Sequence, residues 1–290
     1  MSTSLPSVPA PLTMPFYYAS LINCVVHYLV EVRRVEPFLA KTPLKPALFG
    51  GRASVAFNFQ AYAGQFSGGL AQPSAQWPAS CIGVTQEVEL NIVAYPGAQA
   101  ALLPEVSFEQ WIMGDEQSKL MGNHRVFVPC DSDIAIEAGV KLFGEPKFKT
   151  TFGINLPSLN PVRKPGTAGY EPEWVNTWSF RVNDPEVPAN DIFTCVANLA
   201  GLVPEPGNPS PITEYGQHDN RAIACRWNIL QPFDTYRLNA DQAHRVTLSY
   251  GNSGHPMQLA MKDLLDGAHA HAVQTFMSAP AAIQSRAVFI

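Results

Sequence analysis

The chain has 290 residues, of which 46% are hydrophobic and 15% are charged, so it can bury a large core and does not have the composition of a disordered protein. Its formal net charge is −5 and its basic residues are scattered, which argues against a nucleic-acid partner. The five cysteines are widely spaced and form no C-x-x-C pair, so we expect no disulfide framework, no metal site and a reducing, cytoplasmic location.

The N-terminal region contains a long uncharged run. Residues 1–14 are rich in Ser and Pro, lack the basic region of a signal peptide, and are expected to be flexible. Residues 12–30 carry no charge, but Pro15, Asn23 and His27 interrupt them. The segment Cys24–Val32, which overlaps the end of this run, is rich in β-branched and aromatic residues and favours a strand over a membrane helix. No membrane association is therefore expected.

Strand-like runs dominate the rest of the sequence. Partial alternation of polar and apolar residues in two of them is typical of antiparallel strands with one face on a core. The predicted strands are Val25–Val32, Ser54–Tyr62, Gly83–Tyr95, Arg125–Val128, Phe148–Ile154, Thr177–Val182, Arg221–Leu230 and Arg245–Tyr250. The predicted helices are Glu36–Thr42, Asp131–Gly144, Asp191–Leu199, Pro256–Asp266 and His269–Phe276. Because no βαβ rhythm is present, the sequence predicts an α+β, β-rich single domain over residues 1–290, with an antiparallel barrel- or cone-like sheet and flanking helices.

Three longer segments are predicted to be irregular. Two of them, Asn155–Glu173 and Val203–Asn220, are rich in Pro and Gly, and the third, Leu103–His124, lies between two predicted strands. Loops of this length in a compact domain are often lids, binding loops or oligomer contacts.

One lysine lies in the turn that follows the best-capped predicted helix. The helix ends at Gly144, and the tripeptide Glu145-Pro146-Lys147 comes next, beside an apolar strand. In an apolar pocket the pKa of Lys147 would fall, because burial disfavours the ammonium ion, and the free amine would attack a ketone to form a Schiff base. The alternative interpretation is a surface lysine after a turn.

The residues from Glu87 to Lys149 resemble the acetoacetate decarboxylase-like superfamily. In that family a strand glutamate is followed by a second strand and by a motif of the form D-x-A…G-R-E-x-x-G-[FY]-P-K-K. Here Glu87 matches the strand glutamate and Lys147 matches the Schiff-base lysine, while the segment from Pro256 is similar more loosely. The resemblance implies the family's fold, a lyase that needs no cofactor, a small keto substrate and a homo-oligomer.

The sequence departs from the family motif after the lysine. The family's second lysine is Phe148 here, which supplies no charge but helps to desolvate its neighbour. Lys149 lies two residues beyond Lys147, so in a strand both would face the same side and Lys149 would restore part of the charge repulsion. A solvated Lys149 is the alternative.

Other departures change the polar groups of the family site. The family's aromatic residue before Pro-Lys is Glu145 here, which would raise the pKa of Lys147, act as a general acid or base, or lie exposed in the turn. A second family glutamate falls at Asn58, and the family's N-terminal arginine has no counterpart. The altered polar groups favour a substrate that is more apolar than acetoacetate.

Two further residues are candidates for substrate binding. His124, at the end of the irregular segment, would bind an acidic group of a substrate or would cap a loop. Trp111 would line an apolar pocket or belong to the core. No nucleotide-binding or serine-hydrolase motif is present.

Two hypotheses follow for function. In the first, Lys147 forms an imine with a keto acid or ketone and Glu87 positions the substrate or moves protons, with decarboxylation, aldol-type condensation, dehydration or cyclisation as outcomes. In the second, the same fold binds or cyclises an apolar, polyketide- or lipid-like ligand without covalent catalysis. An imine at Lys147 distinguishes the two hypotheses.

Overall fold

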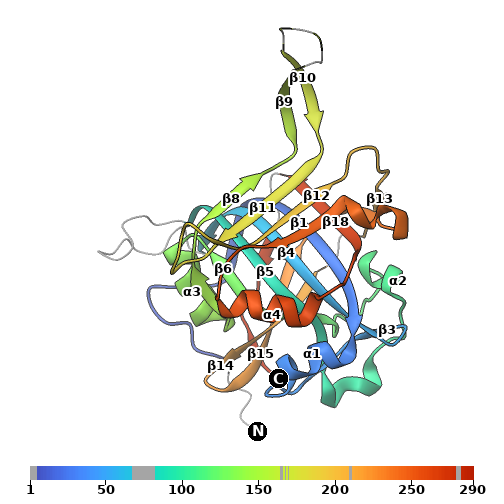
Figure 1. Ribbon diagram of the computed structural model, residues 1–290. Helices are drawn as coiled ribbons and strands as arrows, with labels where there is room; N and C mark the ends of the chain where they lie inside the picture. Colours follow the sequence, from blue (N-terminus) through green and yellow to red (C-terminus); the bar gives the residue numbers. More distant parts are fainter. Residues whose placement is uncertain are drawn as a thin grey trace.

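The structure is a computed structural model that describes residues 5–66, 82–163, 166, 168, 170–208, 211–278 and 282–290. Most of its elements are strands, as predicted (Figure 1). The large sheet contains β1 (Phe16–Glu31), β2 (Leu44–Pro46), β3 (Leu48–Phe49), β4 (Arg52–Phe66), β5 (Ile82–Pro96), β6 (Gly122–Cys130), β7 (Lys147–Lys149), β13 (Glu205–Pro206), β14 (Ile212–His218), β15 (Arg221–Ile229), β16 (Asp234–Arg237), β18 (Ala270–Ser278), β19 (Ala282–Gln284) and β20 (Val288–Phe289). A second sheet contains β8 (Phe152–Asn155), β11 (Thr177–Asn183), β12 (Asp191–Asn198) and β17 (Val246–Tyr250), and β9 (Ser158–Arg163) pairs with β10 (Tyr170–Val175). The helices are α1 (Val32–Leu39), α2 (Phe108–Ile112), α3 (Asp133–Phe143) and α4 (Pro256–Leu265), with short 3₁₀ turns η1 (Gly97–Leu102) and η2 (Ala240–Arg245).

The large sheet curves around an interior. Strand β1 pairs with β4 along one edge and with β18 and β19 along the other. Strands β4, β5 and β6 follow in antiparallel order, whereas β6 pairs in parallel with both β14 and β7. The sheet is therefore mixed, with parallel pairings that the expected antiparallel sheet lacked.

Alternation along the strands gives the large sheet one apolar and one polar face. Along β4, Phe57 and Phe59 belong to the main hydrophobic core, whereas Asn58 and Gln60 make polar contacts on the opposite face. Along β5 the same alternation sets Leu90 and its apolar neighbours against the glutamates at odd-numbered positions. Successive side chains of a strand point to opposite faces, so one face builds the core and the other lines the interior.

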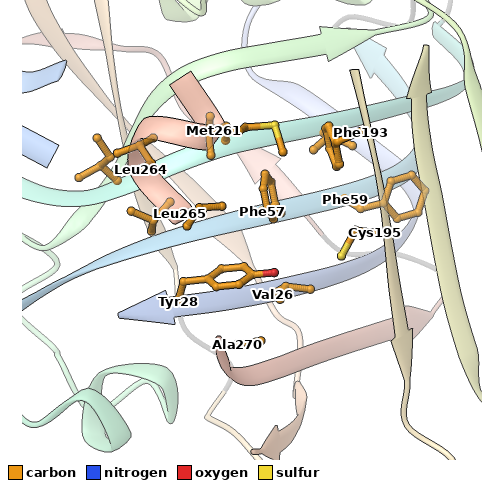
Figure 2. Packing of buried hydrophobic residues seen from close by; sticks show 14 of the residues in the cluster. Val26, Tyr28, Phe57, Phe59, Phe193, Cys195, Met261, Leu264, Leu265 and Ala270 are labelled. Carbon is orange, nitrogen blue, oxygen red and sulfur yellow. The ribbon is translucent and has the colours of Figure 1, made fainter. Parts of the chain in front are cut away.

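The apolar face packs against the second sheet and helix α4. Phe57 stacks on Phe193 with ring centroids 5.2 Å apart, and Phe59 stacks on Phe180 at 5.3 Å. Figure 2 shows the α4 side chains Met261, Leu264 and Leu265 close to Phe57 of β4 in the same hydrophobic cluster. Offset stacking of large rings stabilises such a core beyond the area that the rings bury.

Helix α3 begins and ends as the sequence predicts. The Ser132 side chain accepts a hydrogen bond from the backbone N–H of Ala135, and Gly144 ends the helix in the left-handed conformation, with φ of 62°. A Cβ at Gly144 would lie 2.1 Å from the backbone oxygen of Gln217, so only glycine fits this close contact. Because the helix ends sharply here, the residues that follow it reach the edge of β6, where β7 pairs with that strand.

Two segments predicted as helices are strands. Asp191–Leu199 forms β12, and His269–Phe276 lies mostly in β18. In β12, Phe193, Cys195 and Ala197 alternate into the core, and β-branched residues lie between them. Period-two burial and pairing on both sides override the weak helical pattern of these short segments.

The three segments predicted as irregular contain regular elements. Asn155–Glu173 contains β9 and the start of β10, which form a hairpin that projects from the body of the molecule (Figure 1). Val203–Asn220 contains β13 and β14, and Leu103–His124 contains α2 and the first residues of β6. Proline and glycine in these segments mark turns between short strands.

The described part of the N-terminal segment packs against the domain. Leu12 is buried in a hydrophobic cluster that also contains Phe16 and Leu142. Arg286 Nε donates a hydrogen bond to the backbone oxygen of Pro6 at 3.0 Å. The flexibility expected of residues 1–14 stays a prediction. Within the described ranges, no helix has both the length and the apolar character that a membrane span requires.

Candidate active site

Lys147 lies at the start of β7, where the chain returns from α3 to the edge of β6. Its backbone is in parallel register with Val128, and its side chain is 5% exposed. The Nζ atom lies 2.6 Å from Glu87 Oε2, 2.8 Å from Glu145 Oε2 and 3.4 Å from the backbone oxygen of Ala135. Three acceptors thus surround the Nζ atom, which carries three N–H donors as an ammonium ion.

Gly139 in α3 makes room for the lysine side chain. A Cβ at this position would lie 2.2 Å from Glu145 Oε2 and 2.7 Å from both Cδ and Cε of Lys147. Glycine in a helix interior costs about 1 kcal/mol relative to alanine. At Gly139 that cost permits the helix to pack directly against the lysine.

Glu87 contacts both Lys147 and polar side chains of β4. The Tyr62 hydroxyl donates to Glu87 Oε2 at 3.1 Å, and Gln60 Nε2 donates to Glu87 Oε1 at 3.4 Å. Burial raises the pKa of Glu87 to about 7, although Lys147 acts in the opposite direction. This carboxyl group therefore exchanges a proton near neutral pH.

The electrostatic environment of Lys147 differs from the apolar pocket that the sequence suggested. Burial alone would lower the pKa of Lys147, but the carboxylates of Glu145 and Glu87 raise it well above its ordinary value. The fall expected from burial is therefore wrong for the resting site, whereas the rise expected from Glu145 agrees with the structure, because two carboxyl groups lie within hydrogen-bonding distance of Nζ.

Arg125 on β6 is the second buried cation. Its Nη1 lies 2.7 Å from Glu145 Oε1 and 3.0 Å from Glu214 Oε2, and its Nη2 donates to the backbone oxygen of Phe143 at 3.1 Å. The Arg125 side chain is fully buried. Glu145 thus bridges both cations through its two oxygens.

The buried acids titrate differently. Burial opposes the ionisation of Glu145, but Lys147 and Arg125 outweigh it and lower the pKa of Glu145. Burial raises the pKa of Glu214 well above its usual range, with Glu89 adding to the effect. The cluster contains four carboxyl groups and two cations. Its charges therefore balance when some of the carboxyl groups are protonated.

A chain of amides extends from the charged cluster. Asn58 Nδ2 and Asn91 Nδ2 donate to Glu89 Oε2 at 3.1 and 3.0 Å, and Asn23 Nδ2 donates to Asn58 Oδ1 at 2.7 Å. Burial raises the pKa of Glu89, while Arg125 opposes the rise. Asn58 therefore holds a neighbouring carboxyl group and does not touch Lys147 directly.

Two cavities of different size adjoin these groups. The one beside Lys147 has room for about 10 Å³ and is lined by aromatic and small residues that include Tyr18, Tyr62 and Gly139. The other has room for about 100 Å³ and is lined by Asn58, Asn91 and other residues of the interior face. The lysine itself is therefore closely packed, whereas open space lies at the amide end.

The remaining predicted residues lie away from Lys147. Phe148 points to the opposite face of β7, with its ring 4.6 Å from His255, and Lys149 is half-exposed, with its Nζ 3.0 Å from Asp133 Oδ1. The expected effect of Lys149 on Lys147 therefore lacks a contact to carry it. Burial, with help from Arg125, lowers the pKa of His124 to about 4.

His124 and Trp111 serve different surroundings. His124 interacts with the backbone of Phe38 in α1, which raises its pKa and so opposes the effect of burial. Trp111 in α2 packs its ring 5.6 Å from Phe49 and lines the larger cavity. Of these two candidates, Trp111 is the one that adjoins open space.

Arg125, Glu214, Glu89 and Tyr62 were not predicted as site residues. The alternation along β5 and β4 contains the signal for Glu89 and Tyr62, because they lie two residues from Glu87 and Gln60 on the same faces. Glu214 lies in a segment predicted as a loop, so no sequence pattern placed it beside Arg125. Across the described residues, no three His, Cys, Asp or Glu side chains are grouped to hold a metal ion.

Comparisons with known proteins agree on the fold. No family model matches the chain, and no curated protein sequence matches it. The enduracididine biosynthesis enzyme MppR with HEPES buffer bound is similar with a TM-score of 0.59 and 12% identity, over 96% of this chain and 88% of that one. An acetoacetate decarboxylase-like enzyme from Sphingomonas wittichii RW1 gives 0.57 and 15%, over 98% and 96% of the two chains. Acetoacetate decarboxylase from Legionella pneumophila subsp. pneumophila str. Philadelphia 1 gives 0.55 and 9%, over 98% and 92%.

These similarities define the fold. The chain has the acetoacetate decarboxylase-like fold along nearly its whole length, and the resemblance seen in the sequence is confirmed at that level. Identities this low carry the fold and leave the chemistry to be argued from the site.

Proposed function

We propose that the protein is a lyase without a cofactor that forms a Schiff base between Lys147 and a small keto acid or ketone. The observation that carries this proposal is the buried Nζ of Lys147, 2.6 Å from a carboxyl group whose pKa is about 7. Amine and carboxyl group are thus adjacent and out of water, so Glu87 is in place to take the lysine proton once a carbonyl group displaces the ammonium from its acceptors.

Glu87 is assigned the proton that Lys147 must lose. When a carbonyl group displaces the ammonium from its acceptors, the Nζ proton passes to Glu87 Oε2, and the neutral amine attacks the carbonyl carbon. The carbonyl oxygen takes up a proton from the attacking nitrogen to give a carbinolamine, and the proton held by Glu87 then releases that oxygen as water and leaves an iminium ion. The iminium ion then accepts the electron pair of a neighbouring bond, as carbon dioxide leaves or as a proton passes to Glu87, to give an enamine. The enamine carbon takes up a proton or attacks the carbonyl carbon of a second compound, and hydrolysis of the imine releases the product and restores Lys147.

The neighbouring structures support a small keto substrate. One structure is described as MppR complexed with pyruvate, and another as MppR complexed with the condensation product of pyruvate and imidazole 4-carboxaldehyde. The space beside Lys147 has room for only about one water molecule, so a keto substrate enters when lining side chains such as Tyr18 and Tyr62 shift. We assign the keto group to Lys147 and leave decarboxylation, condensation and dehydration as outcomes of the same imine.

The first test is reductive trapping. The protein is mixed with pyruvate or acetoacetate and borohydride, and the adduct is located by peptide mass spectrometry. We expect one reduced adduct on Lys147, none in Lys147→Ala, and unchanged labelling in the matched control Lys45→Ala. Trapping that persists in Lys147→Ala, or an adduct mapped to another lysine, contradicts the proposal.

The pH dependence of trapping tests the role of Glu87. Glu87 accepts a proton only when it is ionised, and its pKa of about 7 means that this form grows as the pH rises from 5 to 8. The trapping rate should rise over that range with a midpoint near pH 7, while the raised pKa of Lys147 keeps its own titration far above it. Glu87→Gln should remove the midpoint and lower the rate at pH 8 at least about 100-fold.

One observation favours a second candidate function, non-covalent ligand binding. The ammonium of Lys147 already has three acceptors, and the larger cavity is lined by residues other than Lys147. If no keto compound is trapped and a ligand binds Lys147→Ala as tightly as the wild type, the lysine is a structural cation and the fold serves binding alone.

A further inference from the structure

The larger cavity is built from the neutral end of the sheet interior. Its wall includes His27 from β1, Asn91 from β5 and Gln274 from β18, facing Trp111 of α2 and Phe233. With room for about 100 Å³, it is somewhat smaller than cavities of about 150 Å³ that hold benzene. A five-membered ring or a chain of similar size fits this space.

The amide groups in the wall have fixed orientations. Glu89 accepts through its Oε2, so the two amides that contact it, Asn58 and Asn91, must present their Nδ2 donors to it. Asn58 Oδ1 is used by Asn23, but Asn91 Oδ1 is buried and has no partner among the described residues. Asn91 is one of the residues that line the cavity, and its Oδ1 is an amide acceptor that the described residues leave unused.

The tautomer of His27 follows from the same reasoning. Gln274 donates its Nε2 to the backbone oxygen of Ile112 at 2.6 Å and to Thr235 Oγ1 at 3.1 Å, so its Oε1 is the acceptor for His27 Nε2 at 2.9 Å. His27 Nε2 therefore carries the proton and Nδ1 is an acceptor. Burial lowers the pKa of His27 to about 4, so the ring is neutral, and its Nδ1 has no partner within the described structure.

The charged groups in the cavity wall are already engaged. The Glu116 carboxylate accepts from the Lys119 backbone N–H at 3.0 Å and from the Ser118 hydroxyl, while Lys119 Nζ donates to the Glu116 backbone oxygen at 2.6 Å. A cationic ligand would meet the Lys119 ammonium without a free carboxylate to balance it. The wall therefore favours a neutral donor.

We propose that this cavity is a second ligand-binding site, distinct from Lys147, for a neutral group that donates hydrogen bonds through N–H or O–H. Asn91 Oδ1 and His27 Nδ1 are its acceptors, and Trp111 and Phe233 provide the apolar walls. The occupant is either a separate small molecule or the polar part of the compound that reacts at Lys147. The site requires no chemistry at Lys147, so its test is a binding measurement.

The test compares two rings of similar size. Pyrrole has an N–H donor and no strong acceptor, whereas thiophene has neither, so their difference isolates the donor. Dissociation constants are measured on the full-length protein by titration followed with NMR. Pyrrole should bind about five-fold more tightly than thiophene, as expected for one net hydrogen bond. Equal affinities, or no binding of either ring, overturn the proposal.

Variants and a spectroscopic signature locate the site. Asn91→Leu should remove the preference for pyrrole, while the matched surface change Asn252→Leu should keep it; Asn252 is exposed. If Asn91→Leu does not fold, the ¹⁵N chemical shift of His27 Nδ1 is measured in the wild-type protein instead. Pyrrole should change that chemical shift, and thiophene should leave it unchanged. A pyrrole-induced shift absent from His27 contradicts the assignment.

Lys147→Ala separates this site from the reaction. Pyrrole should bind Lys147→Ala as it binds the wild type, whether or not keto compounds are trapped. If saturating pyrrole also changes the rate of pyruvate trapping in the wild type, the cavity holds part of the reacting compound. If the rate is unchanged, the occupant is a separate molecule.

Discussion

The two ends of the sheet interior solve the burial of polar groups differently. At the Lys147 end, two cations form ion pairs with three carboxyl groups and leave room for about 10 Å³. At the Asn91 end, neutral amides and a neutral imidazole border about 100 Å³ and retain unused acceptors. Both ends lie on the same face of β5.

This difference shows what the electrostatics require of each end. A buried charge must be paired and hydrogen-bonded, so the charged end has to be closely packed. A neutral amide that lacks one partner costs about 1–3 kcal/mol, which the fold tolerates where a ligand or water completes the contact. Reactivity is therefore expected at the packed end and selection of the ligand at the open end.

The strongest way to break this comparison is to remove the cation at its centre. Arg125→Leu leaves Glu145 and Glu214 without their buried partner, and removing one member of a buried ion pair typically costs about 3–5 kcal/mol. We expect a loss of that size in the free energy of unfolding, measured by urea denaturation.

An exposed ion pair provides the control for Arg125. Arg237 lies 2.8 Å from Glu205, and both side chains are about half-exposed. Arg237→Leu should cost less than about 1 kcal/mol, because water screens such a pair. If both variants lose similar stability, the charged end is not held together by Arg125.

The contrast between local and long-range contacts also explains what the sequence predicted. The capped end of α3, the following turn and the alternation of β5 are local, so the sequence could name Lys147, Glu87 and Glu145 as candidates, and their side chains lie together in the structure. Arg125 and Glu214 meet through the parallel pairing of β6 with β14, which joins residues far apart in the chain. No local pattern encodes that pairing, and a loop was predicted where β14 lies.

The sequence offered two directions for the pKa of Lys147, a fall from burial and a rise from Glu145, and it could not decide between them for a related reason. The sequence showed apolar neighbours in the chain, whereas the nearest groups in space are carboxylates from β5 and from the turn after α3. Spatial neighbours on other strands decide a pKa, and one sequence does not list them. The β-rich fold was predictable because alternation and capping repeat along the whole chain.

A smaller change sharpens the comparison by filling the packed end. Gly139→Ala would place Cβ 2.2 Å from Glu145 Oε2 and 2.7 Å from the Lys147 side chain. Alanine favours the helix by about 1 kcal/mol, but overpacking costs about 1–3 kcal/mol, so the net effect on stability is a modest loss. Imine trapping should fall at least about tenfold, because both groups must move.

Gly254→Ala is the matched control for this change. Gly254 has no atom within 4 Å of an added Cβ and is exposed. Trapping and thermal denaturation should match the wild type within error. If Gly139→Ala traps pyruvate as fast as Gly254→Ala, the close packing against α3 does not position Lys147.

The smallest effect is expected at Lys149, which tests whether a lysine two residues away tunes Lys147. The Lys149 side chain is 50% exposed and its Nζ lies 3.0 Å from Asp133 Oδ1, so the pair is screened by water and contributes less than about 1 kcal/mol. Lys149→Met should therefore leave stability and the trapping rate nearly unchanged. A fall in trapping comparable to that of Gly139→Ala would mean that charge reaches Lys147 across the strand. The reactivity of Lys147 would then depend on its neighbour in the chain as well as on Glu87 and Glu145.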